Sequence, residues 1–486
     1  MGTAAHTAAR TADMEALYQQ RLGRYVTAMR NEKPDMIPIR PFVAEFTGTY
    51  AGYSCQELAH DFSRAFEAAC KCAADFDWDA VVANMVYVWT GLAQATDLVY
   101  YGIPGIDVPP NRGFQYREPP EDQAFMQADE YDALIADPTG FLYNVWLPRV
   151  ARPVGRLGEP ITEAHNLSFL CGGMAMMLYF MSFPAQVARL RQESGTVSAI
   201  SGIFKAPMDI IADKLRGYMG LVHDLMEQPA KVLAACEALM PYLCEVARSG
   251  ADPDKNVPIG YWMHRGCVPM VTPDQFNNIY WPTVKPIIEE LWAAGHQTLF
   301  YAEGNWDYHL ESFAELPDQS IVYHVDQGDI FKAHQVFGHK FCLSGGIPNF
   351  ILAYRSPDDV RNYCRKVIDG VARDGGYIMD ASAIMQNDAR VENVQAMTEF
   401  TREYGVYPDG HSALGPPCSK SSYAQDHVSR VPGPGPDARP PGTVVPWEKK
   451  RGALGELTGD VDLVRNIWTG IDSLAHTYIW QLLLSF

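Results

Sequence analysis

The stretch from Trp281 to Asp326 reads WPTVKPIIEELWAAGHQTLFYAEGNWDYHLESFAELPDQSIVYHVD, and it decides the fold. Its first part has apolar residues at helical spacing, and residues 298–303 then form a short apolar run that is typical of a buried strand. A second predicted helix covers residues 309–316, and a second predicted strand covers residues 320–326. Single helices that alternate with short apolar strands predict a parallel sheet.

The same alternation extends along most of the chain. Eight candidate strands begin near residues 37, 80, 197, 257, 298, 320, 340 and 376, and single helices separate the later ones. Eight strands that are each almost entirely apolar fit a (β/α)8 barrel better than an open sheet. The sequence therefore predicts an α/β protein with a (β/α)8 TIM barrel, an N-terminal insertion and a C-terminal extension.

Changes in composition divide the 486 residues into segments. The final segment ends in the apolar run TYIWQLLLSF, which is expected to dock on the body or on a second subunit of a homodimer. The predicted segments are an N-terminal helical segment (1–34), the barrel (35–405) with an insertion at about 89–160, a Pro/Gly-rich linker (406–447) and a C-terminal helical tail (448–486).

Charge and cysteine usage exclude several classes of protein. The net charge of −19 argues against a nucleic-acid partner, because affinity for phosphate comes from Lys and Arg. The ten cysteines are scattered without a CxxC pair, which indicates reduced thiols in the cytoplasm. The most apolar run, Leu167 to Phe183, is slightly short for a membrane span and is predicted to be a buried helix. We therefore expect a cytoplasmic protein without a membrane partner.

In a (β/α)8 barrel, reactive groups lie at the C-terminal ends of the strands. Glu303 and His324 end two consecutive predicted strands with 20 residues between them, so they would lie on neighbouring strands and could share one ligand. The polar or glycine residues at the predicted strand ends are Asn84, His264, Glu303, His324, Asp326, Ser344, Gly345, Gly346, Asp380 and Ser382.

A carboxylate and an imidazole together favour a metal, and zinc accepts both as ligands. Glu289, on the preceding helix, is a candidate third ligand. The alternative is that Glu303 and His324 bind each other or cap loops, while Glu289 faces solvent. His264, in YWMHRGC, fits a general base, a ligand or a structural histidine equally well. Backbone N–H groups of Gly345 and Gly346 could face a ligand, although the pair is too short for a phosphate-loop motif.

Several stretches resemble the uroporphyrinogen decarboxylase superfamily, whose members adopt a (β/α)8 barrel. The resemblance covers roughly residues 30–405 and is clearest in FNNIYWPTVKPIIEEL, LFYAEGNWD, VDQGDIFKAHQVFGHKFCLSGGIPNFIL and GGYIMDASAIMQNDARVENVQAM. The arginine-rich segment that holds the substrate of the decarboxylase itself is absent. The corresponding stretch, RPFVAEFTGTYAGYS, contains only Arg40 as a basic residue.

Within the superfamily, the chain is more similar to the ether-cleaving methyltransferase component of corrinoid-dependent O-demethylases. The interval from Glu303 to His324 matches the zinc motif proposed for that branch, whereas Glu289 is one residue too close to Glu303. In the thiol-activating branch, the zinc positions would correspond to Tyr301, Glu303 and Ser382, which are not the ligands of that branch.

The resemblance implies a zinc-dependent methyltransferase. A methoxylated or similar small-molecule donor, for example an aromatic methyl ether, would give its methyl group to the Co(I) corrinoid (cobalamin) of a separate protein. Glu303, His324 and Glu289 would bind zinc, and Gly345 and Gly346 would face the cofactor. His264, Asp326 and Asp380 would contact the substrate or support the ligands. The aromatic side chains expected to line the donor pocket are Tyr87, Trp89, Tyr100 and Tyr101.

Two alternatives remain open from the sequence. One is a decarboxylase-like lyase of the same superfamily that acts on a small organic acid, with Arg40 and Arg265 as the basic residues near strand ends. The other is a non-enzymatic binding protein that keeps the barrel.

Overall fold

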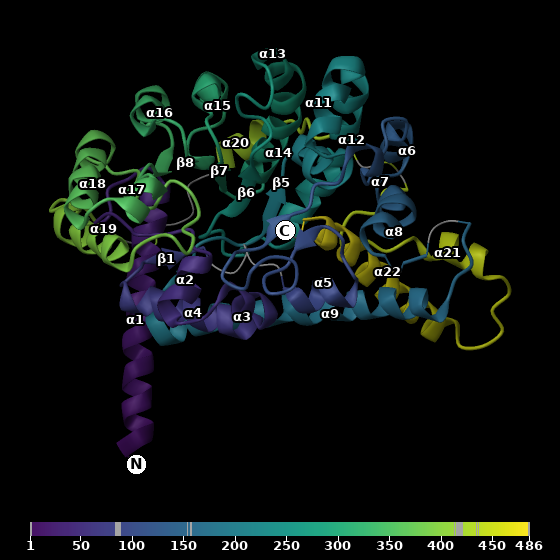
Figure 1. Cartoon of the computed structure of the whole chain (residues 1–486), viewed down its shortest axis with the longest axis horizontal. Helices are drawn as coiled ribbons and strands as arrows, with labels where there is room; N and C mark the ends of the chain where they lie inside the picture. Colours follow the sequence, from purple (N-terminus) through teal and green to yellow (C-terminus); the bar gives the residue numbers. More distant parts are fainter. Residues whose placement is uncertain are drawn as a thin grey trace.

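Parallel strands form the centre of the protein in the computed structural model (Figure 1). The structure describes residues 2–82, 89–152, 154–155, 158–412, 414, 421–433, 435 and 437–484. One sheet has the order β10-β9-β8-β7-β6-β5, and β1 pairs with β4. The strands are β1 (Ala80–Val81), β4 (Val197–Ser198), β5 (Ile203–Lys205), β6 (Ile259–Met263), β7 (Thr298–Ala302), β8 (Ile321–Val325), β9 (Cys342–Gly345) and β10 (Tyr377–Ile378).

The segment 37–43 closes the ring. Ile39 forms a parallel bridge with Met379, just after β10, and Phe42 forms one with Val82, just after β1. This segment takes one barrel position, and β4 and β5 together take another, so the residues described fill all eight positions near the predicted strand starts. The predicted (β/α)8 fold is confirmed.

Gly202 explains why one strand position is split into β4 and β5. Its φ of +79° is rarely adopted by other residues, and a Cβ atom there would lie 2.9 Å from the backbone carbon of Gly250. The chain bends at this glycine, so β4 pairs with β1 while β5 pairs with β6.

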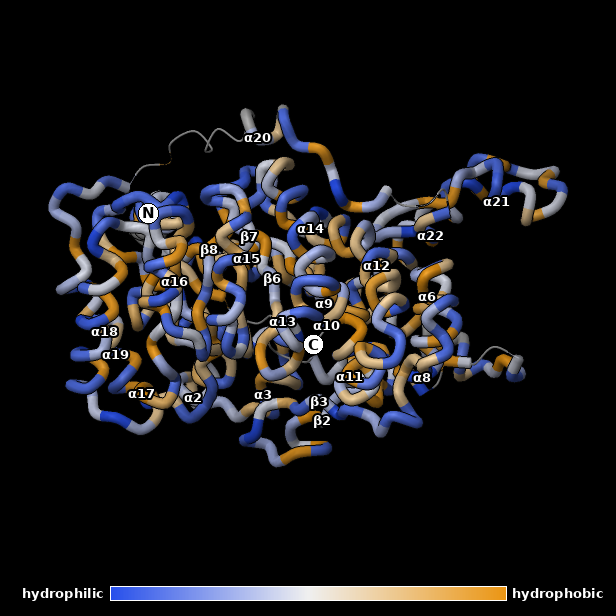
Figure 2. The backbone as a smooth tube through the Cα atoms, turned by 90° about the horizontal axis from the view of Figure 1, so that it is seen from above, coloured by the Kyte–Doolittle hydropathy of each residue, from blue (hydrophilic) through white to orange (hydrophobic). Residues whose placement is uncertain are grey.

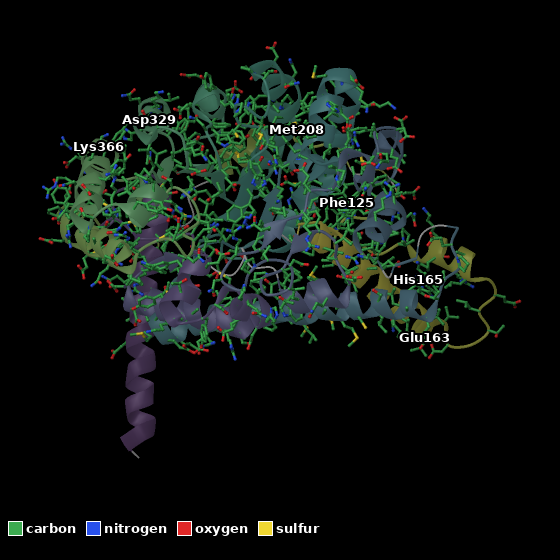
Figure 3. All side chains as sticks on the ribbon, viewed as in Figure 1. Phe125, Glu163, His165, Met208, Asp329 and Lys366 are labelled. Carbon is green, nitrogen blue, oxygen red and sulfur yellow. The ribbon has the colours of Figure 1, made fainter. Side chains whose placement is uncertain are left out.

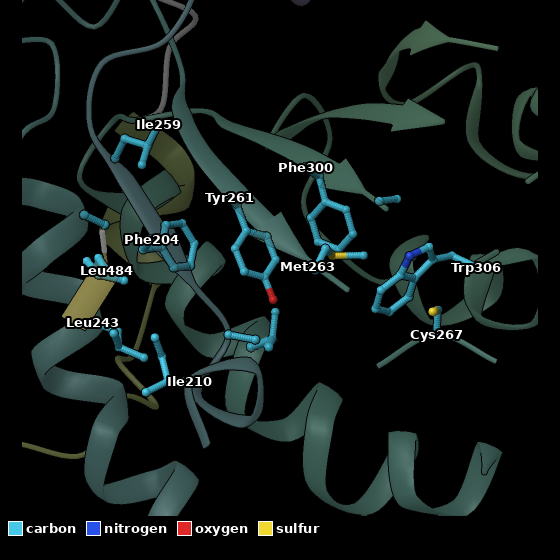
Figure 4. Close-up of a cluster of buried hydrophobic side chains, with 14 of the residues drawn as sticks. Phe204, Ile210, Leu243, Ile259, Tyr261, Met263, Cys267, Phe300, Trp306 and Leu484 are labelled. Carbon is cyan, nitrogen blue, oxygen red and sulfur yellow. The ribbon is translucent and has the colours of Figure 1, made fainter. Parts of the chain in front are cut away.

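The strands are stable in a parallel sheet because both of their faces are covered. All residues of β6, β7 and β8 are buried, as expected for strands with helices packed around them. Aromatic rings fill the space between strands and helices: Tyr261 stacks on Phe204 at 4.5 Å and meets Phe300 edge-on at 5.1 Å (Figure 4). Figure 2 shows hydrophobic and hydrophilic positions alternating along outer helices such as α16 (Ile330–Phe337) and α18 (Pro357–Val371).

Helices that follow the strands cover the outside of the barrel. Three of them begin with a side-chain cap, at Thr272, Asp329 and Ser356, and these side chains accept hydrogen bonds from the first turns of α13, α16 and α18. The helices on this side are α10 (Pro207–Ile210), α11 (Tyr218–Glu227), α12 (Pro229–Ser249), α13 (Pro273–Gln275), α14 (Trp281–Ala293), α15 (Leu310–Phe313), α16 (Ile330–Phe337), α17 (Asn349–Tyr354), α18 (Pro357–Val371) and α19 (Val391–Tyr404).

The N-terminal part adds helices and a hairpin to the barrel. Helix α1 (Gly2–Met29) projects beyond the body with its first turns (Figure 1). The insertion contains an antiparallel hairpin of β2 (Tyr101–Gly102) and β3 (Gln115–Tyr116). The other helices are α2 (Glu45–Ala51), α3 (Cys55–His60), α4 (Phe62–Asp75), α5 (Thr90–Ala95), α6 (Tyr131–Ala136), α7 (Pro138–Phe141) and α8 (Leu147–Val150).

The apolar run that was predicted to be buried forms α9 (Glu163–Arg189), and most of it is exposed. Among the described residues, the helical segment Glu163–Ser194 is long and apolar enough to cross a membrane by length and composition, and 18% of its most apolar window is buried. The expectation of burial is wrong because only one face of α9 packs on the body. Gly172 on that face lies close to the side chains of Thr96 and Tyr478.

The C-terminal residues include α20 (Ser421–Asp426), α21 (Trp447–Leu454) and α22 (Val461–Leu484). The last turns of α22 are buried, and Trp480 stacks on Tyr242 of α12 at 4.7 Å. The Trp480 ring N–H also donates to the hydroxyl of Thr139 at 3.2 Å. The apolar end of the chain therefore lies against the barrel helices and the insertion.

Candidate active site

His264 lies between two carboxylates at the C-terminal mouth of the barrel. It follows β6 directly, and its Nε2 lies 2.9 Å from Oδ2 of Asp213 while its Nδ1 lies 3.2 Å from Oε2 of Glu303. Burial alone would lower the pKa of His264, but the negative charges of Asp213 and Glu303 outweigh burial and raise it to about 10. The imidazole is therefore protonated at neutral pH and can donate from both nitrogens.

Asp213 holds three cations together. Its carboxylate is almost fully buried and lies 2.7 Å from Nε of Arg265 and 3.2 Å from Nζ of Lys205, in addition to His264. Burial would raise the pKa of Asp213, but Lys205 and His264 outweigh burial and hold it well below its usual range. Asp213 belongs to the helical segment η4 (Ile211–Arg216) after β5, so three consecutive barrel positions contribute to this cluster.

Asp209 fixes the turn that carries His264 and Arg265. Its carboxylate accepts hydrogen bonds from the backbone N–H of Arg265 at 2.8 Å and of His264 at 3.4 Å, and from the hydroxyl of Tyr280 at 3.2 Å. Complete burial raises the pKa of Asp209 to about 6 in spite of the nearby His264 charge. The orientation of the imidazole is thus set by the backbone as well as by its ion pairs.

These groups border a cavity of about 490 Å³. Phe114 and Tyr116 come from the hairpin β2–β3, so the insertion forms part of the cavity wall. Trp262 adds a third aromatic side chain from β6. An aromatic wall that faces a charged group is suited to a small, partly apolar ligand with one polar atom. The charged side chains that line this cavity are Glu45, Asp213, His264, Arg265 and Glu303.

A second cavity of about 530 Å³ lies beside the first, at the ends of β8 and β9. Gln327 lines both cavities. Asp326 accepts a hydrogen bond from the backbone N–H of Gly304 at 2.8 Å, and burial raises the pKa of Asp326 to about 6. Asp329, the N-cap of α16, and Lys366 of α18 also line this cavity, and Figure 3 labels both residues.

His324 does not reach either cavity. It is fully buried, and both ring nitrogens have partners: Nδ1 lies 3.0 Å from Oγ of Ser344, and Nε2 lies 2.8 Å from the backbone oxygen of Ser382. Burial lowers its pKa well below the usual range, so the ring is neutral, donates from Nε2 and accepts at Nδ1. The strand register explains this position, because His324 pairs with Tyr301, two residues before Glu303. His324 therefore lies one layer below Glu303.

The predicted zinc ligands are not brought together. Glu289 lies on the outer helix α14, because the segment between it and Glu303 crosses from the helix layer into the barrel. His324 is occupied, and Glu303 is paired with His264. In the part of the chain that the structure describes, no group of three or more His, Cys, Asp or Glu side chains could hold a metal ion. These residues do not fit the predicted zinc site.

The other predicted site residues, Asp380, Gly345 and Gly346, make contacts that support the barrel itself. Asp380 is fully buried, accepts a hydrogen bond from the backbone N–H of Phe42 at 3.2 Å and lies 3.7 Å from Nη2 of Arg40. Gly345 and Gly346 both have a φ of +80°, and a Cβ atom on Gly345 would lie 2.6 Å from the backbone oxygen of Val325. Among these residues, only Gly346 lines the second cavity.

Sequence reasoning missed part of the site. Asp209 and Asp213 lie in KAPMDIIADKLR, where the four-residue spacing of two acids beside two lysines was a usable signal. Two of the aromatic residues predicted to line the donor pocket, Trp89 and Tyr101, line a different, apolar groove. A third, Tyr100, has Nζ of Lys214 4.0 Å from the centroid of its ring. Asn84 and Tyr87 lie outside the described residues.

The occupied nitrogens of His324 lead to a testable prediction. We expect His324→Ala to leave the zinc content of the purified protein unchanged and to lower the free energy of unfolding by about 1–3 kcal/mol, because it leaves buried polar groups without partners. Elemental analysis and urea unfolding measure the two quantities. A wild-type protein that holds stoichiometric zinc and loses it in this variant would make His324 a ligand after all.

Comparisons with known proteins agree with the fold. Residues 182–404 match the family model described as uroporphyrinogen decarboxylase (URO-D). No curated protein matches the sequence. Among solved structures, a methyltransferase from Methanosarcina mazei is similar over 80% of this chain and 98% of that chain, with a TM-score of 0.51 and 16% sequence identity. At this identity, the structural similarity shows a shared fold.

Proposed function

We propose that this chain, whose residues 182–404 match the uroporphyrinogen decarboxylase family model, is a methyltransferase that demethylates a small-molecule donor. The family match supports an enzyme, and the structural likeness to a methyltransferase agrees with this branch. The observation that carries the proposal is the protonated His264, held between Asp213 and Glu303 at a cavity of about 490 Å³. In this proposal the methyl group is accepted by the Co(I) corrinoid of a separate protein, and that corrinoid is a substrate of the reaction.

His264 supplies the proton that the leaving oxygen needs when an ether is demethylated. An alkoxide or phenolate leaves poorly unless its developing negative charge is neutralised. As the bond between the methyl carbon and oxygen breaks, its electron pair stays on oxygen, which takes the proton from His264, and the methyl group passes to the acceptor. A pKa of about 10 matches that of a phenol, so the proton transfer is nearly balanced for an aromatic methyl ether. No step uses zinc.

Asp213 and Glu303 have different tasks in this scheme. Asp213 is nearly fully buried and orients the ring, whereas the Glu303 side chain is 48% exposed to the cavity. After the proton has left, Glu303 is the route by which His264 regains one from solvent. The backbone contacts of Asp209 keep the ring in place through both steps.

A specific observation favours a second candidate, a decarboxylase-like lyase. Arg265 borders the same cavity as His264, and Lys205 lies behind it on Asp213. Arg265 could hold the carboxylate of a small organic acid, with Lys205 adding positive charge from behind, and His264 could protonate the carbon that loses CO2. Arg40, the other basic residue considered from the sequence, is fully buried beside Asp380 and Ser344 and does not border this cavity.

One assay distinguishes the two candidates. The purified protein is incubated with a panel of small aryl and alkyl methyl ethers and with free Co(I) cobalamin in place of the partner protein. We expect the visible spectrum of cobalamin to change as it is methylated, with release of the demethylated alcohol. Release of CO2 from carboxylic acids of similar size, without methylation of cobalamin, would replace the proposal with the lyase.

The pH dependence of the rate follows from the state of His264. Because its pKa is raised to about 10, the proton-donating form is present at neutral pH and is lost as the pH rises through about 10. We expect the rate of demethylation to stay level from neutral pH and to fall only in that alkaline range. A profile of kcat against pH checks this, and a fall centred near 6.5, the ordinary value for histidine, would contradict the role of the ion pairs.

A further inference from the structure

Helix α9 presents an apolar stripe whose spacing is that of a helix packed against another helix. Leu167, Met174 and Met181 recur every seven residues, and Leu170 and Met177 follow the same interval. The large apolar side chains of this stripe, together with Leu178, are between 39% and 69% exposed. A seven-residue repeat of apolar positions is the pattern of knobs-into-holes contact between helices.

Charge is missing along the same stripe. Between Glu163 and Arg189, at the two ends of α9, the sequence contains no Asp, Glu, Lys or Arg. Figure 3 shows Glu163 and His165 together at one end of the helix. Helices that lie on a membrane surface carry Lys or Arg beside their apolar face, and the protein as a whole carries a charge of −19. The stripe therefore suits a protein surface better than lipid.

Helix α22 extends this apolar face. Leu463, Ile467, Ile471 and Leu474 of its first turns are about half exposed. The two helices contact each other, and an apolar groove of about 840 Å³ is lined by residues of both, including Met177, Met181 and Leu474 (helices in Figure 1). The groove is separate from the two cavities at the barrel mouth and shares no lining residue with them.

We propose that the face made by α9 and the first turns of α22 binds a second copy of this chain. From the exposed fractions, its large side chains present on the order of 1,000 Å² of apolar surface, more than the ~800 Å² per partner of a standard interface. A homodimer core is more apolar than other interfaces, which fits a face without charge. The interface requires no complementary charge pattern, so the same stripe can meet itself about a two-fold axis.

The two-fold arrangement places particular residues together. In an antiparallel pair of α9 helices, the residue at the middle of the stripe meets its own copy. Met174 lies midway between Leu167 and Met181, so the two Met174 side chains would be in contact across the axis. The groove beside the stripe would receive apolar side chains of the second copy.

Sedimentation velocity of the full chain at micromolar concentration tests the proposal. We expect wild type to sediment at twice 54.1 kDa. The double variant Met174→Glu/Met181→Glu should dissociate, with affinity weakened at least about 100-fold, because carboxylates would be buried in an apolar interface. The matched control is Met226→Glu on α11, which is 75% exposed and should remain dimeric. A monomeric wild type, or a double variant that stays dimeric, overturns the proposal.

A crosslink tests the geometry independently of affinity. Cys171 is exposed on the same stripe, so it is first changed to serine, and Met174→Cys is added. Mild oxidation should then give a dimer linked through position 174, whereas Met226→Cys in the same background should stay unlinked. Flotation with phosphatidylcholine and phosphatidylserine vesicles covers the lipid alternative: binding by wild type that Met174→Glu/Met181→Glu abolishes would assign the face to membrane and overturn the dimer.

Discussion

His264→Gln is expected to lower kcat for demethylation by about 10²–10⁴-fold, the range that a positioned proton donor contributes. Glutamine keeps much of the size of the ring and can still donate a hydrogen bond, but it cannot transfer a proton. The donor should bind with a similar KM, because the aromatic wall of Phe114, Tyr116 and Trp262 is unchanged. Initial rates with a methyl ether and free Co(I) cobalamin measure both quantities.

A second histidine provides the control for this variant. His223 lies on α11, is half exposed and pairs with Glu121 at 3.2 Å, so His223→Gln should leave kcat within about twofold of wild type. The alkaline fall of the rate near pH 10 should also disappear from the residual activity of His264→Gln. If the variant retains full kcat, the leaving group is neutralised by another route and His264 is a structural residue.

Asp213→Ala is expected to lower the free energy of unfolding by about 3–5 kcal/mol. The substitution leaves the fully buried Lys205 ammonium and the neighbouring Arg265 and His264 without their shared carboxylate. Removing a carboxylate from buried cations is more costly than losing a surface contact, because solvent cannot replace the partner. The pKa of His264 should fall as well, so the alkaline limb of the rate profile should move toward neutral pH. Urea unfolding and the rate profile measure these effects.

An exposed ion pair gives the comparison. Asp132 pairs with Lys231 at 2.8 Å, but the Asp132 side chain is 73% exposed, so Asp132→Ala should cost less than about 1 kcal/mol. Asp213→Asn keeps the shape of the side chain and should be intermediate. Equal stability of Asp213→Ala and wild type would mean that the three cations are hydrated in solution, and the proposed orientation of His264 would fail with it.

Local sequence was sufficient to predict the barrel because each strand is a short apolar run that can be recognised in the sequence. Short apolar runs separated by helical segments recur from β6 to β10, and these strands are buried on both faces, as is usual in parallel sheets. Placing His264, Glu303 and Asp326 directly after β6, β7 and β8 needed only the strand boundaries.

The layer and the partners of each side chain needed tertiary information. His324 differs from Glu303 by one layer of the barrel, and only the pairing of His324 with Tyr301 determines which side chain reaches the cavity. Asp213 belongs to a helix whose turn toward His264 depends on packing, and Phe114 and Tyr116 arrive from a hairpin more than a hundred residues away in sequence. The exposure of α9 could not be read from its composition, because an apolar helix has the same sequence whether the body or a second subunit covers it.

The hairpin β2–β3 belongs to the long excursion between β1 and β4, two strands that pair with each other. Lengthening such an excursion is inexpensive, since each doubling of a flexible loop adds only about 0.6 kcal/mol of closure entropy. The proton donor and its carboxylates come instead from β5, β6, β7 and the segments that follow them. In the proposed function, the hairpin's part of the donor pocket and the proton donor are therefore encoded in separable parts of the chain, so that exchange of the excursion alone could give relatives of this protein new donors with the same chemistry.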